Sequence, residues 1–175
     1  MILIQSNFYS DIDSLINITT NLEFKDSFYG QEVVDFNFIP PDFSDYIQDL
    51  LSGVAVNSNI AINEDSGIFR KPYNNILHFE NYNPNTKLAV LISLEDDLNF
   101  AVYKHNETNI MDYRGIKTNI NLFIEEDMID INKFSMVSNI ALSKNQVLMF
   151  NPYEFHTFSS KLAQVFYIDI LPATM

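Results

Sequence analysis

Residues 145 to 171 read NQVLMFNPYEFHTFSSKLAQVFYIDIL, which is three apolar-rich runs separated by short breaks. Runs of this length that are rich in β-branched and aromatic residues are typical of strands whose faces are half or fully buried. The turn-forming residues Ser143-Lys144-Asn145 precede the first run, and Ser159-Ser160 precede the last. The sequence therefore predicts strands over Gln146–Phe150, Glu154–Phe158 and Leu162–Leu171.

The same texture extends upstream as far as Gly53. Val54, Val56, Ile60 and Ile62 alternate with polar or small residues, as a half-buried strand requires. Seven or eight short strands without long helices between them favour an antiparallel sandwich or barrel over a parallel sheet. The remaining expected strands are Asn74–Glu80, Lys87–Leu94, Asn99–Lys104 and Met136–Leu142.

The first 53 residues have a helical pattern instead. Ser10 or Asp11 can cap a helix over Ile12–Leu22, and Pro40-Pro41 precede a second apolar stripe that stops at Gly53. The four glycines and six prolines form no flexible linker. We expect one α+β, mainly β domain over 1–175, a double-stranded β-helix (jelly roll) with a helical N-terminal part (1–53) and a β core (54–171).

The charge of the chain disfavours several kinds of partner. Its 175 residues hold 23 acidic and 10 basic side chains, a formal charge of −13. This balance weighs against nucleic acid and anionic membrane surfaces, which attract Lys and Arg. No basic-flanked leader or apolar run of about 20 residues is present, which favours a soluble, cytoplasmic protein. The apolar N-terminal helix offers a surface for a homodimer.

The lack of cysteine narrows the chemistry further, because it excludes disulfides, thiolate nucleophiles and Cys-ligated metals. Residues two apart in a strand share a face, so His78 and Glu80 can converge on one ion. His156 lies 78 residues later, in or beside another expected strand. Two imidazoles and a carboxylate on one face of a metal leave positions open, as in non-haem Fe(II) sites.

A simpler interpretation of these residues stays open. A histidine between Leu77 and Phe79 can be a buried, hydrogen-bonded core residue, and Glu80 can be a solvated residue before the Asn-rich loop. His105 is expected at a strand exit in solvent.

Several motifs resemble those of small 2-oxoglutarate/Fe(II)-dependent oxygenase-type proteins of bacteria and phages. Asn7-Phe8-Tyr9-Ser10-Asp11 is similar to their entry into the first helix, and His78-Phe79-Glu80 to their His-x-Asp metal motif. Val102-Tyr103-Lys104-His105 resembles their F-Y-R-H, and the stretch from Lys161 to Tyr167 resembles their R-L-T-Q-V-F-F. The resemblance covers the chain from end to end.

The resemblance implies a function and its residues. His78, Glu80 and His156 would hold Fe(II), and 2-oxoglutarate would be the co-substrate. Lys161 would neutralise its far carboxylate, with Tyr73 and Tyr103 in the cavity wall. The substrate would be a small molecule or a side group of a macromolecule. Glu80 stands where the family has Asp, and Lys161 where it has Arg, a planar fork that Lys lacks.

Two other functions remain open at this stage. The first is a catalytically degenerate jelly roll that serves as a binding or structural protein. The second is a cupin-like metal protein, since Asn145–His156 also resembles the second cupin motif. The first cupin motif, His-x-His followed by Glu, is absent from the sequence.

Overall fold

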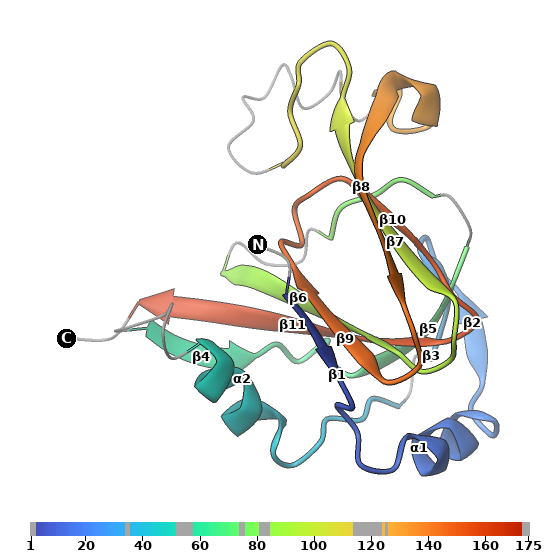
Figure 1. Ribbon diagram of the computed structural model, residues 1–175, viewed down its shortest axis with the longest axis vertical. Coiled ribbons are helices and arrows are strands. Elements are labelled where there is room, and N and C mark those ends of the chain that lie inside the picture. Colours follow the sequence, from blue (N-terminus) through green and yellow to red (C-terminus); the bar gives the residue numbers. More distant parts are fainter. Residues whose placement is uncertain are drawn as a thin grey trace.

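Two antiparallel sheets make up most of the molecule. The computed structural model describes residues 3–33, 36–51, 58–73, 76–80, 85–113, 124 and 126–172. The larger sheet has the strand order β1-β9-β6-β11-β5-β3-β2, with β4 also paired to β11, and the smaller has the order β10-β7-β8. Figure 1 shows β7, β8 and β10 above the long strand β11, and both helices below it.

The strand bounds follow the expected pattern in the second half of the chain. The expected strands at 87–94, 99–104, 136–142, 146–150, 154–158 and 162–171 all have a counterpart within a few residues. The larger sheet comprises β1 (Leu3–Ser6), β2 (Phe24–Asp26), β3 (Gly30–Val33), β4 (Ser58–Ile62), β5 (Ile68–Pro72), β6 (Thr86–Ser93), β9 (Gln146–Phe150) and β11 (Ala163–Pro172). The smaller comprises β7 (Leu98–His105), β8 (Phe134–Leu142) and β10 (His156–Ser159).

Strand β11 is the centre of the larger sheet. It pairs with β6, β5 and β4 and is covered on both faces, which is why residues 162–168 are all buried. Phe166 and Ile168 pack in an outer core between the larger sheet and the helices. Val165 and Tyr167 pack in an inner core between the two sheets. A strand buried on both faces typically has a continuous apolar run, as residues 165–168 of this strand do.

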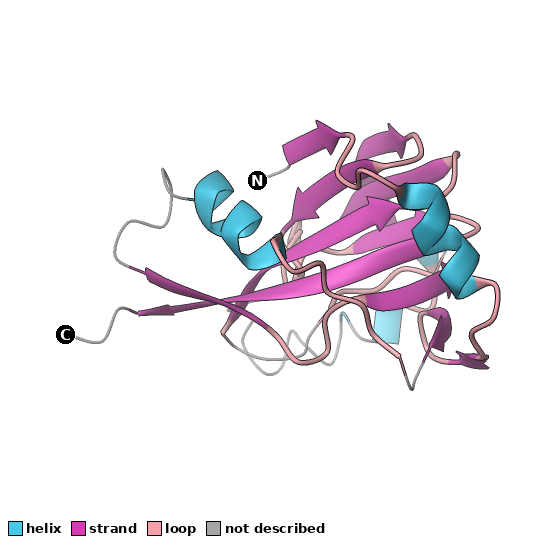
Figure 2. Ribbon diagram, turned by 90° about the horizontal axis from the view of Figure 1, so that it is seen from below, coloured by secondary structure: helices cyan, strands magenta, loops and turns pink. Residues whose placement is uncertain are grey.

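The two helices cover the outer face of the larger sheet (Figure 2). Helix α1 (Ile12–Thr19) is capped by Asp11, whose carboxylate accepts from the Ser14 backbone N–H at 3.0 Å. Helix α2 (Phe43–Leu51) buries Phe43 and Ile47 in the outer core. Helix α1 ends three residues before the expected Leu22. No helix in the described ranges has the length and hydropathy of a membrane span.

Two differences from the expected pattern concern the first half of the chain. Strands β1, β2, β3 and β5 are not in the sequence prediction, so residues 1–53 supply three strands of the larger sheet besides the helices. The alternating residues Ile60 and Ile62 lie in β4, as expected. Val54 and Val56, which belong to the same expected pattern, lie outside the described residues.

The expected strand Asn74–Glu80 is reduced, in its described part, to a single bridge between His78 and His156. The Glu80 backbone N–H donates to the Pro152 carbonyl at 2.6 Å, and Pro152 has no N–H to return. The Glu154 backbone N–H, which would continue the pairing opposite Glu80, donates instead to the Asn151 carbonyl at 3.1 Å, so the pairing is limited to one exchange.

Candidate metal centre

The first residue of β10, His156, lies next to two residues from the segment before β6, His78 and Glu80. The backbones of His78 and His156 exchange two hydrogen bonds, at 2.9 and 2.8 Å, so the two residues are direct cross-strand neighbours. Their imidazole centroids lie 4.4 Å apart. One donor atom from each of His78, Glu80 and His156 lies within 4.8 Å of the others, so residues far apart in the sequence form one cluster.

The cluster is closed to water. His78 is 3% exposed, Glu80 1% and His156 0%. The rings of Phe100 and Phe150 pack against His156, with centroids 5.2 and 4.9 Å away, and Phe158 packs against His78. Burial of this degree makes any polar atom without a partner costly.

Hydrogen bonds on the far side of each ring fix the two histidines. The Nδ1 atom of His78 lies 2.9 Å from the Ile76 carbonyl oxygen, and that of His156 lies 2.7 Å from the Glu154 carbonyl oxygen. A carbonyl oxygen only accepts, so each Nδ1 carries the proton. In the neutral ring the lone pair then lies on Nε2, the tautomer that metal-binding histidines adopt.

Neither Nε2 atom has a hydrogen-bond partner among the described residues. They are the buried side-chain nitrogen or oxygen atoms that have no hydrogen-bond partner within the described ranges. Burial, followed by the charge of His78, lowers the pKa of His156 to about 3, so that ring stays neutral near neutral pH. A lone pair of this kind needs a cation or a donor in front of it.

Glu80 supplies the anionic member of the cluster. Its Oε1 atom lies 3.6 Å from the Nε2 atom of His78. Burial opposes its ionisation, but the Arg70 guanidinium, helped by His78, outweighs burial and holds the pKa of this carboxyl well below its usual range. The group is therefore a carboxylate, and it lies in the same buried cluster as the neutral imidazole of His156.

These donors fit a divalent transition metal. Two imidazole nitrogens and one carboxylate oxygen are the donor set of non-haem Fe(II) sites. Ligand atoms at about 2.1 Å from an ion and at right angles lie about 3 Å apart, so donor atoms that lie within 4.8 Å of one another would have to move closer together to bind one. The charges agree with a bound cation, because among the described residues the single positive charge of Arg70 is paired with two carboxylates, Glu80 and Glu32.

Arg70 and Tyr167 are members of the site that sequence reasoning missed. Arg70 Nη1 donates to Glu80 Oε1 at 2.7 Å, and the Tyr167 hydroxyl donates to Glu80 Oε2 at 2.9 Å. Arg70 is fully buried on β5, where Ala163 of β11 lies opposite it. The sequence contains only two arginines, and the position of one of them directly after Phe69 was the signal that could have pointed to Arg70.

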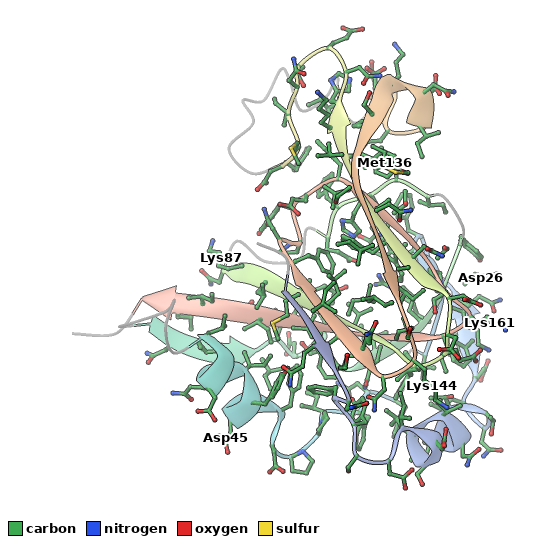
Figure 3. All side chains as sticks on the ribbon, viewed as in Figure 1. Asp26, Asp45, Lys87, Met136, Lys144 and Lys161 are labelled. Atoms are coloured by element: carbon green, nitrogen blue, oxygen red, sulfur yellow. The ribbon has the colours of Figure 1, made fainter. Side chains whose placement is uncertain are left out.

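The predicted co-substrate residues lie outside this cluster. Lys161 is exposed in the turn between β10 and β11, at the rim of the molecule in Figure 3. Tyr73 is 40% exposed, and its hydroxyl donates to Asp26 at 2.8 Å. Tyr103 packs with Leu77 and Phe155 in a third apolar cluster, away from the inner core that holds Phe100 and Val102. Their role in co-substrate binding stays a prediction.

The expectation that His105 faces solvent is wrong. His105 ends β7 but is fully buried, with Nε2 3.0 Å from Asp127 and Nδ1 3.0 Å from the Thr108 hydroxyl. Two polar partners, one of them a carboxylate, compensate for the loss of water around the imidazole.

Comparison with known proteins adds information on the fold. No protein-family model and no curated protein matches the sequence. Among solved structures, HygX from Streptomyces hygroscopicus with nickel, 2-oxoglutarate and hygromycin B bound matches with a TM-score of 0.59 and 14% identity, over 96% of this chain and 81% of HygX. An oxidoreductase of the 2OG-Fe(II) oxygenase family from Burkholderia pseudomallei matches with a TM-score of 0.52 and 11% identity, over 96% and 84%. The chain therefore has the double-stranded β-helix fold of 2-oxoglutarate/Fe(II) oxygenases.

Proposed function

We propose that this protein is a non-haem Fe(II)/2-oxoglutarate-dependent oxygenase. One observation carries the proposal, namely two buried Nε2 atoms without a partner, beside the Glu80 carboxylate, in a double-stranded β-helix. HygX has the same fold and binds nickel and 2-oxoglutarate.

Each member of the triad has a defined task in this proposal. The Nε2 atoms of His78 and His156 and the carboxylate of Glu80 hold the metal, and the carbonyl bonds to both Nδ1 atoms keep the rings in the binding tautomer. Bound Fe(II) would couple decarboxylation of 2-oxoglutarate to insertion of one oxygen atom of O2 into succinate and the other into the substrate. Phe100, Phe150 and Phe158 exclude water from the site.

The co-substrate carries a second carboxylate that needs a cation. Lys161 lies in the turn two residues before Ala163, where β11 begins and where the side chain of Ala163 belongs to the inner core between the sheets. Within the described part of the chain it has no ion-pair partner. Lys161 is therefore our proposed anchor for the far carboxylate.

The substrate in this proposal is a small molecule or an exposed side group. The HygX structure with hygromycin B bound is an example of a small organic molecule on this fold. The charge of −13 favours substrates that are neutral or cationic over anionic ones.

The test is the visible charge-transfer band of the Fe(II)–2-oxoglutarate chelate, recorded without oxygen. We expect the band with the natural chain and its loss in His156→Ala, which removes one ligand. Lys161→Ala should need more 2-oxoglutarate for half of the band, whereas Lys144→Ala, another surface lysine, should not. A natural chain that gives neither a band nor a thermal shift with Fe(II) and 2-oxoglutarate would exclude the oxygenase.

A catalytically degenerate binding or structural protein is the second candidate, and the contacts of Glu80 favour it specifically. Both of its oxygens already accept a hydrogen bond, from Arg70 and from Tyr167. In a protein without a metal, these contacts would make Glu80 part of a structural ion pair. The second candidate predicts that Fe(II) leaves the melting temperature unchanged.

A further inference from the structure

We propose that Arg70 and Tyr167 are positioning residues that hold the carboxylate of Glu80 at the metal site. The inference rests on the proposed function, because it concerns how this chain presents its carboxylate ligand. It assigns a task to two residues that touch Glu80 and to which the family resemblance gives no role.

The two residues bind different oxygens of the same carboxylate. Arg70 Nη1 donates to Oε1 at 2.7 Å and the Tyr167 hydroxyl to Oε2 at 2.9 Å, so the plane of the carboxylate is fixed at both ends. A carboxylate has about four lone-pair sites, and these two bonds use two of them. Oε1, the oxygen 3.6 Å from the Nε2 atom of His78, therefore keeps a lone pair for an ion.

Arg70 is itself held from the side opposite Glu80. Its Nε atom donates to Glu32 Oε1 at 2.5 Å, and Glu32 lies directly across from it on β3. The Tyr29 ring, in the β2–β3 turn, lies 4.6 Å from the guanidinium carbon and 4.9 Å from the His78 ring. A cation against an aromatic face is stabilised, more so without water. The guanidinium thus has little freedom to leave Glu80.

Tyr167 is fixed through its backbone as well as its ring. Its backbone N–H donates to the Ser66 hydroxyl at 2.9 Å, and that hydroxyl donates back to the Tyr167 carbonyl at 3.0 Å. The residue also lies in the middle of β11, opposite Ala89 of β6. The Tyr167 hydroxyl therefore donates to Glu80 from a position that the strand holds in place.

The arrangement matches a glutamate and would not suit an aspartate. The proteins that this sequence resembles have Asp at this position, and one methylene less would withdraw the carboxylate by roughly 1.5 Å, the length of one C–C bond. Hydrogen bonds of 2.7 and 2.9 Å do not survive a withdrawal of that size. Glutamate has one more rotatable bond to immobilise, and the two donors restrict it.

The experiment measures the affinity for Mn(II) by titration calorimetry, without 2-oxoglutarate or oxygen. Residues that orient metal ligands typically contribute 10- to 100-fold in affinity. We expect Tyr167→Phe and Arg70→Lys to weaken binding about tenfold or more. Glu80→Asp should also weaken binding, although Asp is the residue of the similar proteins.

The matched control is Tyr9→Phe. It removes a different tyrosine hydroxyl bond, the partly buried one at 2.5 Å to Gln164, which lies on the opposite face of the same strand β11. Thermal unfolding of both tyrosine variants without metal measures the structural part of the loss. Tyr9→Phe should lower the melting temperature as Tyr167→Phe does but keep the Mn(II) affinity within twofold.

The outcomes separate this inference from the proposed function. If the natural chain binds Mn(II) and Tyr167→Phe, Arg70→Lys and Glu80→Asp bind it equally well, the positioning role is wrong and the metal site stands. If the natural chain binds no Mn(II), the metal site and the positioning role both fall. Tenfold or larger losses in these variants, with Tyr9→Phe unchanged, support the inference.

Discussion

Replacing Arg70 by methionine tests whether the buried charge network is arranged as described. Methionine keeps an unbranched apolar stem but removes the guanidinium, which leaves Glu80, 1% exposed, and Glu32, with its side chain 17% exposed, without their cation. Removing one partner of a buried ion pair usually destabilises by about 3–5 kcal/mol. For a chain of this size 1 kcal/mol lowers the melting temperature by about 2–4 °C, so we expect a fall of about 6–20 °C.

The assay is urea unfolding followed by circular dichroism, with chelator present, on a double-mutant cycle of Arg70→Met and Glu80→Gln. The neutral amide of Glu80→Gln relieves the uncompensated charge, so the double variant should lose less than the two single losses added together. A loss below about 1 kcal/mol for Arg70→Met, or additive losses in the cycle, would refute the arrangement of Arg70 and Glu80.

Three other predictions concern the scaffold and the site. Gly67 has φ +81°, and a Cβ there would lie 2.5 Å from the Phe38 carbonyl oxygen, so urea unfolding of Gly67→Ala should show a loss of about 1–3 kcal/mol or more; an unchanged midpoint would contradict this. Phe166→Ala empties a fully buried position stacked on Phe43 at 4.1 Å and should cost about 3–5 kcal/mol in the same assay, whereas a loss below about 1 kcal/mol would mean that the outer core is not packed there. Mn(II) at 100 times its dissociation constant should stabilise the natural chain by about 2.7 kcal/mol, seen as a rise in melting temperature that His78→Ala abolishes.

The strands of the second half could be predicted because their signals are local. Apolar runs and the turn residues between them predicted β8, β9 and β11 to within a few residues, since each strand's own sequence carries this signal. Strand β5 carries no such signal, because Arg70 and Lys71 interrupt its apolar residues. It becomes a strand through pairing with β11 on one side and β3 on the other, and sequence patterns do not contain those contacts.

In the candidate site too, the features with a local sequence signal could be predicted, and those that depend on contacts between distant segments could not. The i, i+2 spacing placed His78 and Glu80 on one face, and that spacing can be read from the sequence alone. The burial of Arg70 and His105 could not be predicted, since a charged residue looks exposed until its partner is known. Their partners, Glu80 and Glu32 for Arg70 and Asp127 for His105, come from other segments that only the folded chain brings near.

The most direct test of the metal centre is anomalous diffraction from crystals of the natural chain grown with Mn(II). We expect one peak at about 2.0–2.2 Å from the Nε2 atoms of His78 and His156 and from one oxygen of Glu80. Crystals in which both Nε2 atoms face no ion, while Glu80 remains bound only to Arg70 and Tyr167, would contradict the metal centre and with it the proposed oxygenase.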